Sequence, residues 1–221
     1  MVEQPLCKRQ VVSSNPTEGT NKDNMDNDIL TIPDLIPKSY QDEIEHEMTS
    51  LMFPWSYKHD VSGQPNHPTV FTNDTNIVKR DAFIHLFYAA ESNIVSPYFG
   101  LIKPLLYFLE EKSGFKTSNL LRMRAVLTYK DPNWDSEQYL TPHIDDPLPH
   151  KTLIYYVNQC DGDTFFYKDF FIQGQENFNK RVLEKRMSPV KGTGVLFDGH
   201  RYHGNGVGRE HNRIVINMNF N

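Results

Sequence analysis

Five short runs rich in β-branched and aromatic residues restrict the fold of this chain more than any other feature. They lie after residue 118 and cover 120–129, 151–158, 164–168, 194–198 and 213–220. Turn residues separate them, as in Cys160-Asp161-Gly162. Short strands at such spacing favour a sandwich or barrel over a parallel α/β sheet. We therefore expect a mainly β fold with flanking helices, of the α+β kind.

Two helical segments are expected before these strands. Pro37 suits the first turn of a helix that runs through Ser50, with Ile44 and Met48 on its apolar face. Ser96-Pro97 suits the start of a second helix that ends near Gly114. Pro104 lies inside that second segment, and it predicts a kink or a break there.

The 221 residues suit one folded domain with a tail. Residues 1–28 are dominated by Ser, Asn, Thr, Asp, Glu and Lys, and we expect them to be disordered. Residues 29–221 are predicted to form a single domain. Its helical part would cover 29–118 and its barrel core would cover about 119–221.

Charge and cysteine content restrict the partners and the compartment. The net charge of −5 provides no general attraction to nucleic acid, so no nucleic-acid partner is expected. Cys7 and Cys160 do not suggest a disulfide framework, and no apolar run approaches the roughly 20 residues that span a bilayer. We expect a cytoplasmic monomer or homodimer without membrane contact.

The chemistry of the chain is indicated by His143-Ile144-Asp145 and by His203, which follows 58 residues after Asp145. Residues i and i+2 of an extended segment point to the same side, so His143 and Asp145 can reach one metal. Two histidines and one carboxylate cover one face of Fe(II) and leave the other face open, as in non-haem oxygenases. The sequence therefore predicts an iron site.

The third ligand has two candidates. His200 competes with His203, and we favour His203 because Gly204 follows it and because it lies ten residues before Arg213. Arg213 begins an apolar strand, where its guanidinium could hold the far carboxylate of a dicarboxylate cosubstrate by a bidentate pair. Arg122 and Arg124 share one face of their strand, and either an anionic ligand or solvent could face them.

An ordered series of motifs extends beyond these residues. It contains Pro142-His143-Ile144-Asp145, the strand 152–158, Asp161-Gly162-Asp163-Thr164-Phe165, the segment 189–198, and finally His203 and Arg213-Ile214-Val215-Ile216-Asn217. Over about residues 120–220 this series resembles the Fe(II)/2-oxoglutarate-dependent oxygenase superfamily, and especially its prolyl 4-hydroxylase-like branch.

The resemblance implies a double-stranded β-helix, which is a jelly-roll or cupin-like barrel, with the metal at its mouth. It assigns His143, Asp145 and His203 to Fe(II) and Arg213 to the 5-carboxylate of 2-oxoglutarate. Tyr156 matches a tyrosine that touches this carboxylate in prolyl-hydroxylase-like members. Thr152 shares the strand face of Tyr156 and is a candidate second donor. Tyr129 is a further candidate for the lining of the cosubstrate pocket.

The reaction implied by the resemblance is the hydroxylation of a C–H bond with O2, releasing succinate and CO2. The resemblance also admits ascorbate as a reductant. An amino acid or peptidyl, prolyl-like substrate is the first expectation. Aromatic residues of 53–57 and Trp134 are candidates for an exposed substrate rim, and 131–140 is a candidate lid.

Two other classes of function stay open from the sequence. One is a non-catalytic jelly-roll that keeps the fold as a binding module. The other is a different metal enzyme, such as a cupin-type dioxygenase or a zinc hydrolase that uses the same three ligands. Turnover of 2-oxoglutarate separates the leading interpretation from both.

Overall fold

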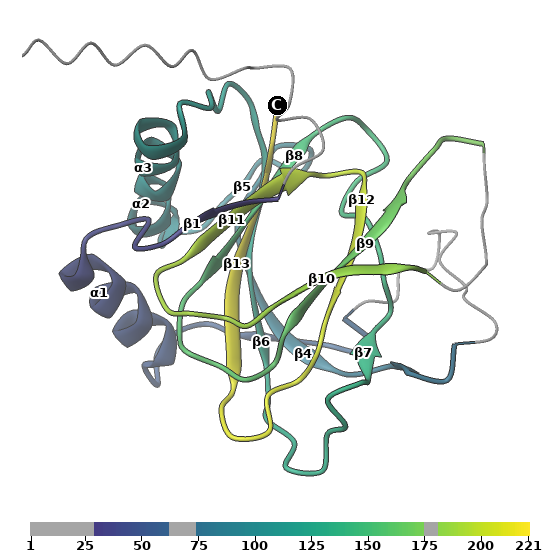
Figure 1. Cartoon of the computed structure of the whole chain (residues 1–221). Coiled ribbons are helices and arrows are strands. Elements are labelled where there is room, and N and C mark those ends of the chain that lie inside the picture. Colours follow the sequence, from purple (N-terminus) through teal and green to yellow (C-terminus); the bar gives the residue numbers. More distant parts are fainter. Residues whose placement is uncertain (1–28, 62–73, 175–180) are drawn as a thin grey trace, which may run out of the picture.

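An eight-stranded antiparallel sheet forms the centre of the computed structural model, which describes residues 29–61, 74–174 and 181–221 (Figure 1). The predicted disordered tail, residues 1–28, lies outside the described residues. The strand order is β1-β11-β8-β13-β6-β4-β2, and β5 pairs with β4. These strands are β1 (Leu30–Ile32), β2 (Ser56–Lys58), β4 (Ala82–Ala89), β5 (Ile94–Val95), β6 (Leu120–Thr128), β8 (Lys151–Tyr156), β11 (Gly194–Asp198) and β13 (Arg213–Phe220).

A smaller antiparallel sheet packs against the large one through apolar side chains. It has the order β10-β9-β12, with β9 (Thr164–Phe170), β10 (Leu183–Met187) and β12 (Arg201–Asn205). Phe166 of β9 meets Phe197 of β11 edge to face, with ring centroids 5.0 Å apart. A parallel pair of two-residue strands, β3 (Ile77–Val78) and β7 (Tyr139–Leu140), completes the β structure of the described residues. The two main sheets face each other without closing into one sheet.

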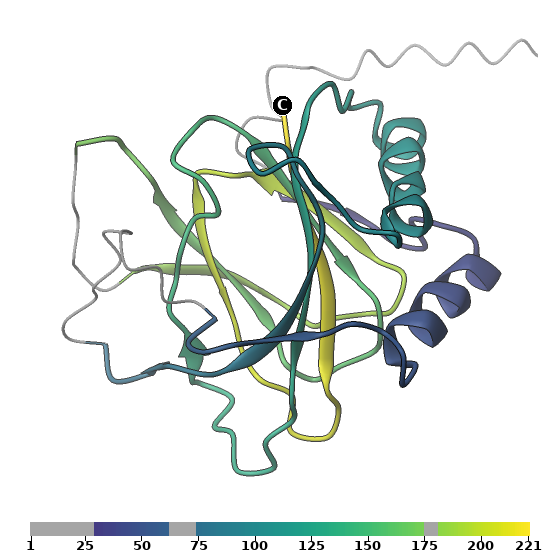
Figure 2. The ribbon, with the colours of Figure 1, turned by 180° about the vertical axis from the view of Figure 1, so that it is seen from behind.

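Three helices cover the outer face of the large sheet (Figures 1 and 2). They are α1 (Lys38–Thr49), α2 (Phe99–Ile102) and α3 (Pro104–Ser113). The predicted break at Pro104 is confirmed, because α3 begins there as a separate helix. Gly114 ends α3 in the left-handed conformation, with φ of 70°. No helix in the described part of the chain is long and apolar enough to cross a membrane.

Side-chain alternation on the central strands separates two environments. Leu153 and Tyr155 on β8, like Ile214 and Ile216 on β13, belong to the buried cluster that packs under the helices. The intervening residues of both strands belong to a second cluster between the sheets. This period of two makes one face of the large sheet a helix-covered core and the other face the wall of an interior space.

The predicted fold class is therefore confirmed. All five predicted strands are present as β6, β8, β9, β11 and β13, with ends that shift by at most two residues. The segment after Phe170, which lies outside the five predicted strands, contains strand β10, and this strand pairs with β9.

The fold leaves no room for a side chain at Gly162, which lies in the turn before β9. A Cβ atom there would lie 2.6 Å from the backbone nitrogen of Gly208 and 2.8 Å from the carbonyl carbon of Val207. We expect Gly162→Ala to lower the free energy of unfolding by about 1–3 kcal/mol, because backbone must shift to admit the methyl group.

Gly100→Ala is the matched control, since a Cβ atom at this helical position has no neighbour within 4 Å. It should leave stability unchanged or raise it by up to about 1 kcal/mol. Equilibrium unfolding in urea measures both free energies. Equal stability of the two variants would contradict the close packing of the Gly162 turn.

Candidate metal centre

His143 and His203 are held opposite each other by their own backbones. His143 lies in the loop after β7, and His203 lies on β12. The His143 N–H donates to the His203 carbonyl at 2.8 Å, and the His203 N–H donates to the His143 carbonyl at 3.0 Å. This is the hydrogen-bonded pair of an antiparallel ladder, which places the two side chains on the same side. Their ring centroids are 4.7 Å apart.

The hydrogen bonds of the two rings decide which nitrogens face the site. His143 Nδ1 donates to the carbonyl of Thr141 at 3.0 Å, and His203 Nδ1 donates to the carbonyl of Arg201 at 3.2 Å. A carbonyl only accepts, so each Nδ1 carries the proton and each Nε2 keeps a lone pair. The Nε2 of His203 is buried and has no hydrogen-bond partner in the part of the chain that the structure describes. A buried polar atom without a partner is rare, and it is the atom with which a neutral histidine binds a metal.

Both imidazoles are neutral at physiological pH. Burial, together with the neighbouring His203, lowers the pKa of His143 to about 3. Burial also lowers the pKa of His203. A metal therefore meets two lone pairs and does not have to displace protons.

Asp145 is the third member of the cluster, and neighbours on the large sheet fix its carboxylate. Asn219 donates from Nδ2 to Asp145 Oδ2 at 3.0 Å, and the same nitrogen donates to Thr152 Oγ1 at 3.0 Å. Arg122 donates from Nη2 to Asp145 Oδ1 at 3.0 Å. Burial alone raises the pKa of Asp145, but the guanidiniums of Arg122 and Arg124 outweigh it and hold this pKa well below its ordinary value.

The three side chains fit a divalent metal. One ligand atom from each of His143, Asp145 and His203 lies within 4.8 Å of the other two. Two imidazole nitrogens and one carboxylate oxygen form the donor set of mononuclear Fe(II) sites. His200 lies outside this cluster, because its Nε2 contacts the carbonyl of Pro147 at 3.1 Å. The structure thus brings together the three residues favoured from the sequence.

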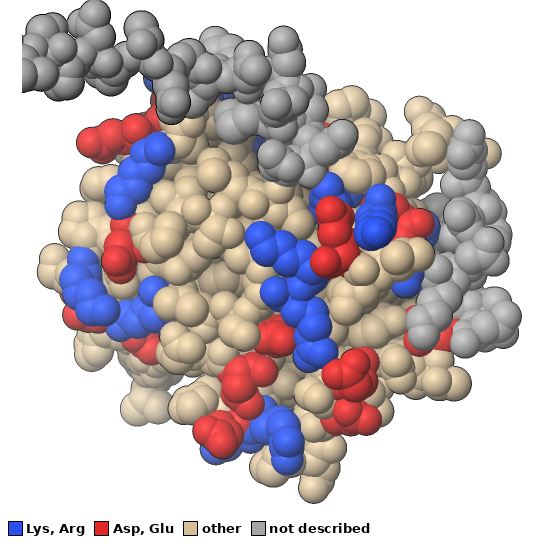
Figure 3. Space-filling model, viewed as in Figure 1, with Lys and Arg blue, Asp and Glu red and all other residues tan. Residues whose placement is uncertain are grey.

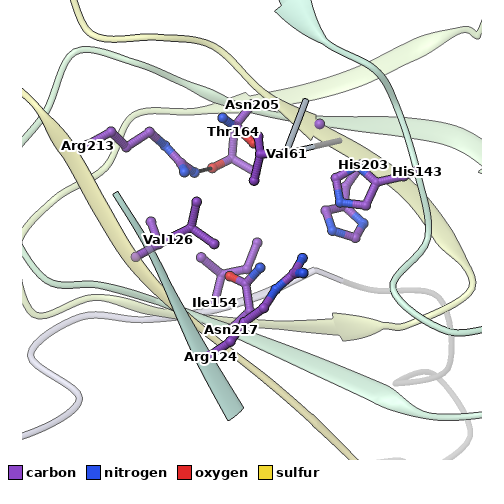
Figure 4. Close-up of a pocket in the computed structure, with 12 residues that line it drawn as sticks. Val61, Arg124, Val126, His143, Ile154, Thr164, His203, Asn205, Arg213 and Asn217 are labelled. Atoms are coloured by element: carbon purple, nitrogen blue, oxygen red, sulfur yellow. Dashed lines mark hydrogen bonds between the residues drawn. The ribbon is translucent and has the colours of Figure 1, made fainter. Parts of the chain in front are cut away.

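A cavity between the two sheets extends from the histidine pair to Arg213 (Figure 4). Side chains of β6, β8 and β13 form one wall, and Thr164 of β9 and Asn205 of β12 lie opposite. Strand pairing orders that wall into rows, counted from the metal end. The rows are Arg122, Asn219 and Thr152, then Arg124, Asn217 and Ile154, then Val126, Val215 and Tyr156, then Thr128 and Arg213.

Arg213 lies at the far end of this cavity with its guanidinium directed inward (Figure 4). Its Nε donates to the carbonyl of Gly162 at 3.1 Å, and its Nη2 donates to Thr164 Oγ1 at 2.8 Å. The residue is 3% exposed, and no carboxylate among the described residues forms an ion pair with it. Burial lowers the pKa of Arg213, and it outweighs the opposite effect of the neighbouring Tyr156, Cys160 and Asp163.

Tyr156 lies beside Arg213, as the sequence predicted. Its hydroxyl donates to Thr164 Oγ1 at 2.8 Å, and the guanidinium carbon of Arg213 is 6.0 Å from the centre of its ring. The Thr164 hydroxyl accepts from both residues, which leaves its own proton free to donate. Thr164 had no role in the sequence-based prediction, although it belongs to the motif 161–165.

Thr152 and Tyr129 are not brought to Arg213. Thr152 is in the row of Asn219, six residues along β13 from Arg213, or about 20 Å of extended strand. It shares the strand face of Tyr156 but lies at the metal end. Tyr129 is 53% exposed and lines a separate surface pocket with Tyr57 and Phe83. The structure therefore does not support either residue as a contact of the predicted cosubstrate.

The substrate rim expected from the sequence is not exposed at all of its positions. Trp134 is 5% exposed, and the guanidinium of Arg80 lies 5.8 Å from the centre of its ring. Arg80 also forms an ion pair with Asp131 at 2.7 Å. The expectation that Trp134 is an exposed rim residue was wrong, because the loop 131–140 packs this side chain against the body of the protein.

The space inside the cavity that a water-sized molecule can occupy is about 30 Å³. That volume holds about one or two water molecules. The open space between the lining side chains, counted with the part that is open to solvent, is about 430 Å³. Among the described residues, Arg124 is held by one ion pair of 3.5 Å to Asp145, whereas Arg213 makes two hydrogen bonds. Arg124 is therefore the long side chain that can move more easily.

Comparison with known proteins supports the fold. No family model matches the sequence, and no curated protein sequence matches it. Among solved structures, a 2OG-Fe(II) oxygenase family oxidoreductase from Burkholderia pseudomallei is similar with a TM-score of 0.58 and 13% identity, over 87% of this chain and 84% of that one. A Trichoplax adhaerens prolyl hydroxylase, in complex with a hypoxia inducible factor peptide fragment, has a TM-score of 0.54 and 16% identity, over 88% and 83%.

A third similar structure is the epimerase SnoN in complex with Fe3+, alpha ketoglutarate and nogalamycin RO. Its TM-score is 0.52 at 12% identity, over 88% of this chain and 78% of that one. The chain thus has the fold of the 2OG-Fe(II) oxygenases, the double-stranded β-helix, and it carries a His-Asp-His cluster. At these identities the likeness concerns the fold.

Metal binding can test whether His203 or His200 is the third ligand. We expect His203→Ala to weaken Fe(II) binding by more than about 100-fold, since loss of even an outer partner of a metal ligand costs 10- to 100-fold. His200→Ala should leave the affinity unchanged. Anaerobic equilibrium titration with Fe(II) measures both. A greater loss in His200→Ala would assign the third ligand to His200.

Proposed function

We propose that this protein is an Fe(II)- and 2-oxoglutarate-dependent dioxygenase that hydroxylates a C–H bond of an amino acid or peptidyl, prolyl-like substrate. One observation carries the proposal. Arg213 is a buried guanidinium without a carboxylate partner among the described residues, and it lines the same cavity as His143 and His203. A cavity that contains both a set of metal-binding side chains and a buried cation without an ion-pair partner suits a ligand that is both a chelator and an anion.

The energetics of Arg213 explain why an anion belongs beside it. A buried cation without a partner is costly, and proteins keep one where a counter-ion binds. Arg213 donates to Gly162 and Thr164 through Nε and Nη2, so further N–H groups remain for a carboxylate. Thr164 and Tyr156 surround the same point. Together they form a site for the 5-carboxylate of 2-oxoglutarate.

The middle of the cavity suits the carbon chain of such a ligand. Val126, Val215 and Ile154 line it between the metal end and Arg213. Apolar walls exclude water and favour methylene groups. A ligand with a carboxylate at each end and an apolar middle therefore matches the order of polar and apolar rows along the cavity.

At the metal end, His143, Asp145 and His203 would hold Fe(II) through two Nε2 atoms and one carboxylate oxygen. The bound metal, 2-oxoglutarate and O2 supply the oxidising chemistry, in which one oxygen atom enters succinate, the other enters the substrate, and CO2 leaves. The protein orients the ligands: Thr141 and Arg201 fix the histidine rings, and Asn219 fixes the carboxylate.

The likeness to a prolyl hydroxylase in complex with a peptide fragment supports a peptidyl substrate. The net charge of −5 and the mixture of acidic and basic side chains on the face in Figure 3 favour a small-molecule or peptidyl partner over nucleic acid. We place the protein in the cytoplasm as a monomer or homodimer, without membrane contact and with ascorbate as an accessory reductant.

Arg213→Ala tests the assignment of the carboxylate site. Loss of a hydrogen bond to a charged group costs about 1.5–3 kcal/mol, so the 2-oxoglutarate concentration for half-maximal succinate formation should rise about 10- to 150-fold. Arg209→Ala, which removes an exposed arginine from the preceding turn, is the matched control and should change nothing.

Succinate and CO2 formation from 2-oxoglutarate, measured with Fe(II) and O2, decides between the classes of function. If Arg213→Ala needs the same 2-oxoglutarate concentration for half-maximal succinate formation, Arg213 is not part of the cosubstrate site. Absence of succinate at any 2-oxoglutarate concentration, with Fe(II) bound, would favour another metal enzyme. Absence of both metal binding and turnover would favour a non-catalytic module.

A further inference from the structure

Two arginines lie beside the carboxylate of the candidate metal cluster. Arg122 and Arg124 are two residues apart on β6, so their side chains share the interior face. The Nη2 atom of Arg122 is 3.0 Å from Asp145 Oδ1, and that of Arg124 is 3.5 Å from the same oxygen. The two arginine side chains are only 25% and 12% exposed. The carboxylate of Asp145 is thus in contact with two largely buried cations.

These charges exceed what Asp145 can neutralise. Arginine keeps its proton in proteins, so Arg124 carries a positive charge beside the Asp145 carboxylate. Arg122 carries a second positive charge, and the two imidazoles are neutral. One carboxylate with two guanidiniums has a net charge of +1 before any metal binds. A divalent metal bound by His143, Asp145 and His203 raises it to +3, in a site with little solvent to screen the repulsion.

Unpartnered atoms beside Arg124 indicate where the compensating charge belongs. Arg124 Nε is buried and has no hydrogen-bond partner among the described residues, and the same is true of Asn217 Oδ1, which is in the same row. Both residues line the cavity between the histidines and Arg213 (Figure 4). Within the described part of the chain, Arg124 is held by the ion pair of 3.5 Å alone. Its guanidinium can therefore turn toward an anion at the metal.

We propose that Arg122 and Arg124 make metal binding conditional on an oxyanion that chelates the metal, such as a 2-oxo acid or oxalate. A divalent metal alone binds weakly because it adds to an uncompensated positive charge. A chelating carboxylate beside Arg124 removes this repulsion. Since coupling between two ligands is reciprocal, the metal strengthens binding of the anion by the same factor. This inference rests on the proposed function for its biological cosubstrate, but the coupling itself needs only the cluster and the arginines.

Mn(II) titration of the whole chain, followed by the electron paramagnetic resonance signal of free Mn(II), tests the coupling. It is carried out with and without saturating oxalate, a two-carbon dianion that fills only the metal end. The Mn(II)–oxalate complex that forms in solution is measured without protein and subtracted. For the unmodified chain we expect oxalate to tighten Mn(II) binding by about 5- to 150-fold, the usual range of coupling between two sites.

Arg124→Met removes one cation and keeps an unbranched side chain. It should bind Mn(II) alone about tenfold or more tightly than the unmodified chain, within the usual range of coupling, and oxalate should then have a smaller effect. A merely structural role of Arg124 predicts the opposite, because damage to the site weakens metal binding. Arg122→Met should also bind Mn(II) alone more tightly than the unmodified chain. Arg209→Met, which removes an exposed positive charge outside the cavity, is the charge-matched control and should behave like the unmodified chain.

The outcomes separate this inference from the proposed function. If neither methionine variant binds Mn(II) alone more tightly, or if oxalate has the same effect in all variants, the inference is wrong even when 2-oxoglutarate is converted to succinate. If the coupling is found but 2-oxoglutarate is never converted, the proposed function is wrong and the inference stands. If Arg124→Met does not fold, Arg122→Met and the oxalate dependence of the unmodified chain still decide it.

Discussion

The paired backbones of His143 and His203 hold two parts of the structure in the one arrangement that makes a metal site. Their reciprocal hydrogen bonds join the loop after β7 to strand β12 of the small sheet. From this pair the chain needs only two residues to reach Asp145, whose carboxylate is fixed by Asn219 at the end of β13. One loop supplies His143 and Asp145, and strand β12 supplies His203. The large sheet fixes the carboxylate of Asp145. Small changes in this pairing would separate the ligand atoms, because a shift of one residue turns a side chain to the opposite face.

The large sheet arranges charge along the cavity. Arg124 lies near the metal end, Val126 and Val215 line the middle, and Arg213 lies at the far end. Buried cations at both ends of an apolar interval favour a ligand with two anionic ends. Strand register sets this order of charged and apolar residues along the cavity, since Arg124, Val126 and Arg213 are on strands that pair directly. Under the proposed coupling, charge at the metal end makes the site bind the metal and the cosubstrate together.

Much of this arrangement could be predicted from local patterns. Runs of β-branched and aromatic residues between turn residues identified five strands, Pro104 identified the break between α2 and α3, and the i, i+2 spacing identified His143 and Asp145. Strand β12 was not recognised as a strand, because Arg201–Asn205 contains a glycine and no apolar alternation and is defined by its pairing with β9. Strand β4 was missed although Ala82–Ala89 is rich in aromatic and apolar residues, a signal that the sequence did contain.

Long-range register explains the errors at the site. Alternation along β8 correctly placed Thr152 and Tyr156 on one face, but only pairing with β13 shows that they lie at opposite ends of the cavity. The contacts of Thr164 with Arg213 and of Asn219 with Asp145 join residues 49 and 74 positions apart, and no local pattern contains them. The excess positive charge around Asp145 likewise becomes visible only when β6 is placed beside the ligand loop.

Anaerobic visible absorption shows whether one cavity binds Fe(II) and 2-oxoglutarate together. Fe(II) is added to the protein first and 2-oxoglutarate second, without O2. We predict a weak charge-transfer band that appears only with the second addition, is lost in His203→Ala and requires Arg213 at moderate 2-oxoglutarate concentration. Tight Fe(II) binding with no band at any 2-oxoglutarate concentration would contradict joint binding in this cavity.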